Sequence, residues 1–303
     1  MSLRAVGGVL ALVVAACGAT EIVTNTAGAA PVAKRVAGRP GAQSTVHAAA
    51  RPYAAAAPAQ GRTRMTVRPA TVWVGADIAT VWVKPRLVRP VDSQALRAHP
   101  RIARWINRQT LGQREDLDSR VMTQALRGEQ LVLLKRRDGW SKVRIPDQFG
   151  SGFPSGIVGW IPTPQLTSAQ PRRHVLPLIR GRHGSGTTAL RLARHYLGVR
   201  YLWGGMTSAG IDCSGLTYRV YRQLGVVLPR DAADQSRVGR HVSRAALRRG
   251  DLVFFGSGSW RGVHHVGIYA GHGRLLHAPH TGTVVQVTPL RAFHDYWGAR
   301  RIR

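Results

Sequence analysis

The chain has 303 residues, enough for two ordinary domains, and its formal net charge at pH 7 is +30. Only four lysines stand against 40 arginines, so the basic balance reflects a compositional bias as much as a function. The arginines are scattered and no nucleic-acid-binding motif occurs, which argues against nucleic acid as a partner. Two interpretations of the charge stay open: a solvated basic surface, and attraction to an anionic cell envelope or its polymers.

The N-terminus predicts export. Arg4 precedes an apolar run over residues 5–16, which is too short to span a bilayer but suits a signal peptide. A small-x-small site closes residues 1–29, so the mature chain is predicted to be secreted, extracellular or associated with the cell wall. The alternative is a lipoprotein acylated and retained at Cys17, which ends a lipobox-like segment. Under simple secretion, which we favour, Cys213 is the only thiol and no disulfide forms within the chain.

A basic linker and a β-rich region follow. Residues 30–64 are rich in Ala, Pro, Gly and Arg and show no persistent helical or strand periodicity, which predicts a disordered linker. Residues 65–170 contain short alternating segments such as Thr71–Val74, with Gly-rich turns between them, and predict a small barrel. An Arg-rich, helical-looking insertion near 94–127 interrupts this pattern. The spaced tryptophans of the region are either core packing, which we favour, or a platform for a ligand.

After a second linker at residues 171–186, residues 187–303 form a predicted catalytic domain organised around one cysteine. Asp212 has the chemistry of an N-cap, so Cys213 is the predicted first residue of a helix that ends before Gly225. Helix N-termini and nearby imidazolium groups lower the pKa of a thiol, which would make Cys213 a nucleophile if a base is close. The competing interpretation is a small buried core residue.

Two later apolar runs carry candidate bases. Residues 263–269 and 275–279 each predict a strand, with a Gly-His-Gly turn between them. Alternation places His265 on the opposite face from Val266 and Ile268. His277, on the neighbouring strand, could hold the first ring in orientation, which is the third role of a catalytic triad.

Six short motifs occur in one order along the C-terminal half. They are Tyr201-Leu202-Trp203-Gly204-Gly205, Asp212-Cys213-Ser214-Gly215-Leu216, Leu228-Pro229-Arg230, Gly250-Asp251-Leu252-Val253-Phe254-Phe255, His265-Val266-Gly267-Ile268-Tyr269 and His277-Ala278-Pro279. The series resembles the NlpC-type (NlpC/p-sixty) cell-wall cysteine peptidases over residues 187–303. Two further elements, 138–143 and 159–162, resemble bacterial SH3-like wall modules. The resemblance implies an α+β fold: a circularly permuted papain-like domain, with a helix packed on an antiparallel sheet, preceded by a small SH3-like β-barrel.

The same resemblance implies roles for individual residues. Cys213 would be the nucleophile, His265 the base, because the family's histidine directly precedes Val-Gly, and His277 the orienting residue. Family members with an SH3-like domain look like γ-D-glutamyl-L-diamino acid endopeptidases that need a free N-terminal L-Ala. The matching substrate-binding positions are Tyr201, Trp203, Asp212, Ser214, Arg230 and Asp231. Asp212 and Asp231 suit an ammonium pocket, and the open alternative is that both are helix caps.

The expected reaction is acyl transfer through a thioester on a peptidoglycan stem peptide. No cofactor or metal is expected, because the histidines are not grouped with a second thiol or a carboxylate at zinc-ligand spacing. We also expect a monomer without a transmembrane span. The alternatives are a related muramoyl amidase or acyltransferase, and a non-catalytic protein that binds the cell wall.

Overall fold

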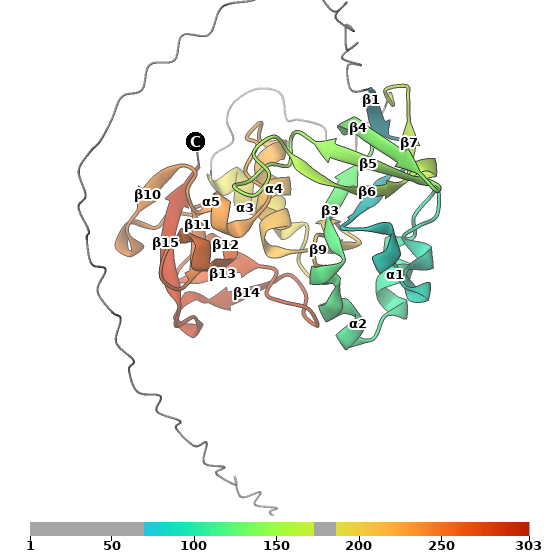
Figure 1. Ribbon diagram of the computed structural model, residues 1–303. Helices are drawn as coiled ribbons and strands as arrows, with labels where there is room; N and C mark the ends of the chain where they lie inside the picture. Colours follow the sequence, from blue (N-terminus) through green and yellow to red (C-terminus); the bar gives the residue numbers. More distant parts are fainter. Residues whose placement is uncertain (1–69, 173–185, 303) are drawn as a thin grey trace, which may run out of the picture. The chain divides into compact units, whose positions relative to one another are not determined.

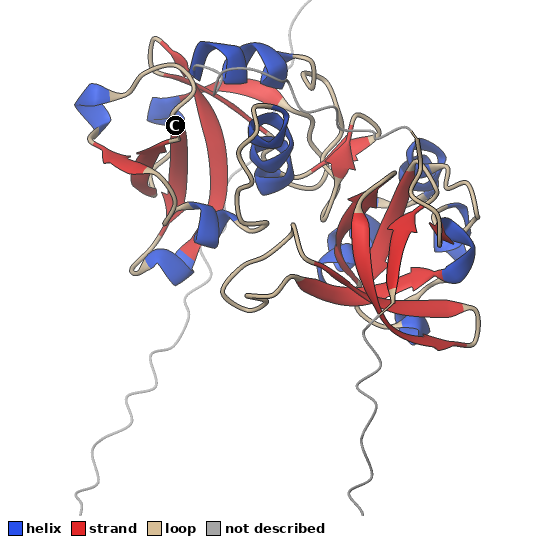
Figure 2. Ribbon diagram, turned by 90° about the horizontal axis from the view of Figure 1, so that it is seen from above, coloured by secondary structure: helices blue, strands red, loops and turns tan. Residues whose placement is uncertain are grey.

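Two antiparallel sheets organise the chain in a computed structural model that describes residues 70–172 and 186–302 (Figures 1 and 2). The first sheet has the spatial order β3 (Val121–Leu126), β2 (Ile78–Trp82), β6 (Ile157–Pro162), β5 (Trp140–Ile145), β4 (Gln130–Arg137), β1 (Thr71–Val74) and β7 (Leu166–Thr167). The predicted signal peptide 1–29, the linker 30–64 and most of the linker 171–186 lie outside the described residues.

Strict alternation builds the first sheet. In β5, Ser141, Val143 and Ile145 are buried while the residues between them are half-buried on the opposite face. The hairpin from β4 to β5 turns at Asp138 and Gly139, whose φ angles are +49° and +75°. Two consecutive positive φ angles are typical of a type I′ turn, whose twist matches that of the paired strands. The predicted β-rich region is therefore a curled antiparallel sheet, and its assignment as an SH3-like barrel stays a prediction.

The insertion near 94–127 is helical only in part. Its centre forms α1 (Ile102–Arg108) and α2 (Leu111–Glu115), and α1 buries Ile102, Trp105 and Ile106. The prediction is wrong for its last residues, because Val121–Leu126 forms β3 and pairs with β2. Burial against a neighbouring strand outweighs the weak local preference of this segment.

The second sheet has the spatial order β10 (Arg240–Val242), β15 (Tyr296–Arg301), β11 (Leu252–Gly256), β12 (Val263–Gly271), β13 (Arg274–His277) and β14 (Gln286–Pro289). Three helices contact β12: α3 (Gly186–Arg194), α4 (Cys213–Gln223) and α5 (Ala232–Gln235). A short hairpin of β8 (Met206–Thr207) and β9 (Gly210–Ile211) precedes α4. This confirms a fold of helices packed on an antiparallel sheet, whereas the circular permutation stays a prediction.

Strand β12, which carries His264 and His265, is covered by a hydrophobic cluster on each face of the second sheet. Val266 and Ile268 are fully buried in the cluster that includes Leu216 and Val220 of α4. Alternate positions of the sheet point toward a second cluster around Phe255 and Leu275.

Within the described ranges, no helix is long and apolar enough to cross a membrane.

Candidate active site

Cys213 is the first residue of α4, as predicted. The Asp212 side chain accepts a hydrogen bond from the Gly215 backbone N–H at 2.6 Å and so caps the helix. The helix ends before Gly225, whose φ of +83° suits glycine. Cys213 lines a cavity of about 410 Å³ together with His265 and His277. The structure thus brings together the three residues predicted to be catalytic.

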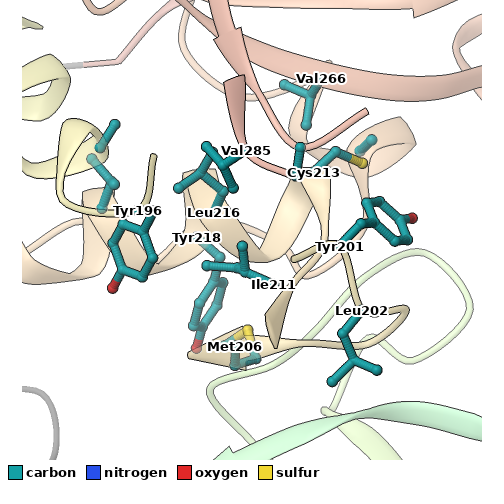
Figure 3. Close-up of a cluster of buried hydrophobic side chains, with 14 of the residues drawn as sticks. Tyr196, Tyr201, Leu202, Met206, Ile211, Cys213, Leu216, Tyr218, Val266 and Val285 are labelled. Atoms are coloured by element: carbon teal, nitrogen blue, oxygen red, sulfur yellow. The ribbon is translucent and has the colours of Figure 1, made fainter. Parts of the chain in front are cut away.

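The sulfur lies beside the strand that carries His265. The backbone N–H of Val266, the next residue, is within hydrogen-bonding reach of Cys213, and the side chain points toward Tyr201 (Figure 3). Burial, and then the negative charge of Asp212, raise the pKa of the Cys213 thiol to about 12. The expected lowering of this pKa by the helix N-terminus is wrong, because desolvation of the thiolate is the larger effect. At rest the Cys213 side chain is therefore a thiol.

The two predicted histidines form a hydrogen-bonded line. His265 Nε2 lies 2.8 Å from His277 Nδ1, and His277 Nε2 lies 2.9 Å from Thr288 Oγ1 on β14. Among the described residues, His265 Nδ1 has no hydrogen-bond partner, so this nitrogen is the one left for the thiol. Thr288 was not predicted, since no local signal distinguishes it. Its position follows only from the pairing of β13 with β14.

Burial sets the charge state of both rings. It lowers the pKa of His265 from the ordinary 6.5 to about 3, with a further contribution from His277. It lowers the pKa of His277 to about 4. His264, by contrast, is exposed and its Nε2 lies 2.9 Å from Asp295 Oδ2. Both rings line the cavity with Cys213, but only His265 is buried and hydrogen-bonded to His277.

Three of the predicted substrate-binding residues are bonded to one another. Arg230, which is only 2% exposed, donates from Nη2 to Asp212 Oδ2 at 2.6 Å and from Nη1 to Ser214 Oγ at 2.8 Å. Asp212 also holds the N-terminus of α4, so its carboxylate is already fully engaged. This geometry favours the N-cap alternative for Asp212 over the role of ammonium ligand.

The buried network continues into the first sheet. Arg230 Nε donates to Thr123 Oγ1 on β3 at 2.9 Å, and Thr123 Oγ1 in turn donates to Gln148 Oε1 at 2.7 Å. Gln148 Nε2 donates to the Gln124 carbonyl at 2.8 Å and lies near Glu129, whose pKa is raised by burial. A strand of the β-rich region therefore supports the residues around Cys213. Sequence reasoning missed Thr123, because its partner is 107 residues away.

The other three predicted binding residues are open to a ligand. Tyr201 lines the cavity with Cys213. Trp203 is 41% exposed and donates from Nε1 to the Val121 carbonyl at 3.0 Å. Asp231 is exposed at the start of α5 but makes no capping hydrogen bond, so its interpretation as a helix cap is not supported. Desolvation by the surrounding protein raises the pKa of the Asp231 carboxyl, and Arg230 acts in the opposite direction.

A cysteine at a helix start, beside an imidazole that a second ring orients, is the arrangement of cysteine peptidases. Within the described ranges, no group of three His, Cys, Asp or Glu side chains is placed to hold a metal ion. Residues 198–303 match the model of the NlpC/P60 family.

Similar proteins extend this match along the chain. The gamma-D-glutamyl-L-lysine dipeptidyl-peptidase of Bacillus subtilis (strain 168) is 30% identical over 270 residues, which cover 70% of this chain and 91% of that protein. The murein DD-endopeptidase MepS/murein LD-carboxypeptidase of Escherichia coli (strain K12) is 48% identical over 104 residues, 34% of this chain and 53% of that protein.

A solved structure agrees with these matches. The crystal structure of an NlpC/P60 family protein from Bacillus cereus ATCC 10987 superposes with a TM-score of 0.69 at 25% identity, and the match covers 77% of this chain and 99% of that chain. The chain belongs to the NlpC/P60 family, and the prediction of a cysteine peptidase of this family is confirmed.

Proposed function

We propose that this chain is an exported cysteine endopeptidase that hydrolyses peptidoglycan stem peptides at the γ-D-glutamyl-L-diamino acid bond. The observation that carries the proposal is the line from Thr288 through His277 to His265, which ends in the cavity lined by Cys213. The choice of bond is supported by the relative named gamma-D-glutamyl-L-lysine dipeptidyl-peptidase, which is matched over 91% of its length.

The hydrogen bonds allow one arrangement of protons in which His265 Nδ1 is a base. His265 Nε2–H donates to His277 Nδ1, and His277 Nε2–H donates to the Thr288 hydroxyl oxygen. The low pKa values of both rings keep them neutral near pH 7, as this arrangement requires. In this arrangement Thr288 accepts from His277 and His277 accepts from His265, which leaves His265 Nδ1 unprotonated.

The proposed reaction has two halves. As Cys213 Sγ attacks the γ-glutamyl carbonyl, its proton passes to His265 Nδ1, so the reaction requires no resting thiolate. The Cys213 backbone N–H is a donor for the oxyanion, and one such donor lowers the barrier by about 3 kcal/mol. His265 then protonates the departing amine of the diamino acid. Water, deprotonated by the same imidazole, hydrolyses the thioester and restores the thiol.

Asp231 is the proposed partner for the free ammonium group of the stem peptide. Asp212 is engaged by Arg230 and by its helix, whereas Asp231 is exposed and its charge interacts with that of Arg230 nearby. Tyr201 and Trp203 would form the walls against which the peptide lies. A buried or half-buried ammonium requires a carboxylate, and Asp231 can supply one without breaking the existing network.

The decisive experiment is mass spectrometry of muropeptides digested by the purified protein. We expect fragments from cleavage between γ-D-glutamate and the diamino acid, no turnover by Cys213→Ala, and loss of activity in His265→Ala. His272→Ala is the control, because it removes an exposed ring that lines a different cavity and should leave activity unchanged. Products of cleavage at the muramoyl–L-Ala bond or at a D–D cross-link would refute the proposed bond, and turnover by Cys213→Ala would refute the thiol mechanism.

Export is tested on the protein secreted by the native cell. We expect the mass of a mature chain whose first residue lies near Ala30, which corresponds to removal of residues 1–29. A lipid-modified protein that begins at Cys17 would establish the lipoprotein alternative instead.

A further inference from the structure

Three of the four lysines of this arginine-rich chain line a single cavity of about 530 Å³ on the first sheet. They are Lys84, Lys135 and Lys142, and they are all the lysines within the described ranges. Two half-buried tryptophans, Trp140 and Trp160, form part of the same wall. We call this site the lysine–tryptophan cavity.

The strand register places like charges directly opposite one another. Lys135 of β4 pairs with Lys142 of β5, and Lys142 pairs with Trp160 of β6. Next to this row, Arg137 of β4 pairs with Trp140 of β5. Like charges at directly opposed positions of an antiparallel pair destabilise the sheet. The arrangement therefore costs stability unless an anion lies over it.

Nothing within the described ranges neutralises these lysines. The cavity is lined by five cationic side chains and one carboxylate, that of Asp138, which is held by Arg137 at 2.8 Å. None of the three lysines has an ion pair among the described residues. By comparison, Arg89 and Arg120 in the same region each pair with a carboxylate.

The two tryptophans also present unused donors. The indole N–H groups of Trp140 and Trp160 have no hydrogen-bond acceptor within the described ranges, whereas those of Trp105 and Trp203 donate to Asp92 and to the Val121 carbonyl. Indoles that are only half-buried, with a free N–H at the rim, combine an apolar face with a polar tip. The cavity shares no lining residue with the one that holds Cys213.

We propose that the lysine–tryptophan cavity binds an acidic polysaccharide, with sugar rings on the indole faces and the anionic groups on the lysines. Lysine carries a point charge on a flexible stem, whereas arginine makes a bidentate contact of fixed geometry. The lysine side chain therefore suits the repeated, variably placed anions of a polymer. The tryptophan N–H groups can donate hydrogen bonds to the hydroxyl oxygens of the sugars. A polymer held here would keep the enzyme on a carbohydrate surface without occupying the catalytic cavity.

The test measures binding of the full-length protein to soluble polymers at low and moderate salt. The probes are oligogalacturonate as the acidic glycan, a glycan-phosphate polymer as the second source of anions, dextran as the neutral glycan, poly-L-glutamate as the polyanion without sugar, and single-stranded DNA. We expect an acidic glycan to bind at least tenfold more tightly than dextran and poly-L-glutamate. Which of the two acidic glycans binds more tightly identifies the source of the anion, carboxylate or phosphate.

Matched variants locate the binding. Lys135→Gln/Lys142→Gln should weaken binding of the acidic glycan at least tenfold, and Trp160→Leu should weaken it without changing the net charge. Arg248→Gln/Arg249→Gln is the control, because it removes two exposed charges from the lining of a different cavity. The lysine variant should also unfold at the same or a higher urea concentration, since it relieves the Lys135–Lys142 pair.

Several outcomes would overturn the proposal. Equal losses in the lysine variant and the arginine control would show that only net charge matters. Poly-L-glutamate binding as tightly as the acidic glycans would remove the role of the sugar. Tighter binding of single-stranded DNA than of either glycan would assign the cavity to nucleic acid instead.

Discussion

Replacing Thr123 with valine tests whether the first sheet supports the nucleophile. The Thr123 hydroxyl accepts from Arg230 Nε at 2.9 Å and donates to Gln148 Oε1 at 2.7 Å, and Thr123 is fully buried. Valine has nearly the same shape and also favours strands, so it removes both hydrogen bonds with little change in packing. The substitution leaves a buried guanidinium N–H and a buried amide oxygen without their partner.

The size of the effect follows from those two orphaned groups. Each buried polar atom that loses its partner costs about 1–3 kcal/mol, and more when a charged group is involved. We therefore expect Thr123→Val to lower the free energy of unfolding by about 2–4 kcal/mol. Because Arg230 also holds Asp212 and Ser214 at the start of α4, we expect kcat/KM on a muropeptide to fall roughly tenfold or more.

Thr80 provides the matched control. It lies on β2, which pairs with β3, and it is equally buried, but its hydroxyl has no hydrogen-bond partner among the described residues. Thr80→Val should leave the urea midpoint unchanged or raise it, since the hydroxyl is desolvated without compensation. If both variants shift the midpoint by the same amount, or if Thr123→Val retains full activity, the inferred support of the nucleophile by β3 is wrong.

Three further predictions concern the site. Thr288→Val removes the hydrogen-bond partner of His277 Nε2 and should lower kcat about tenfold in steady-state assays while KM changes little. Asp231→Asn should raise KM about tenfold or more for a stem peptide with a free amine, and should leave an N-acetylated peptide unaffected; equal effects on both would exclude an ammonium contact. Stability should fall on acidification, because the folded-state pKa values of His265 and His277, about 3 and 4, lie below the ordinary 6.5, so the unfolded chain takes up protons first. Between pH 7.5 and 4.5 each ring should cost about 2.5 kcal/mol, so the free energy of unfolding of His277→Gln, measured in urea, should fall by that much less over this range; an unchanged slope would contradict the burial of a neutral His277.

The local features of this protein, its helix caps, strand faces and hairpin turns, could be predicted from its sequence. Asp212 caps the helix that begins at Cys213 because the two interacting groups are three residues apart. Alternation placed His265 on the face opposite Val266 and Ile268, because the direction of a side chain on a strand depends only on its parity, and the family motif selected His265 over His264. Helix caps, strand faces and hairpin turns involve neighbours along the chain, and a resemblance of ordered motifs then identified the family.

Tertiary structure alone decided the contacts between distant segments. Val121–Leu126 is a strand because β2 lies beside it, and Arg230 meets Thr123 across 107 residues. Only the packing of α4 against β12 reveals that burial raises the pKa of the Cys213 thiol rather than lowering it. The sequence by itself thus predicted the candidate site residues and how each is presented locally. Their partners, charge states and desolvation depended on which surfaces the folded chain brings together, because burial and long-range pairing have no signature in neighbouring residues.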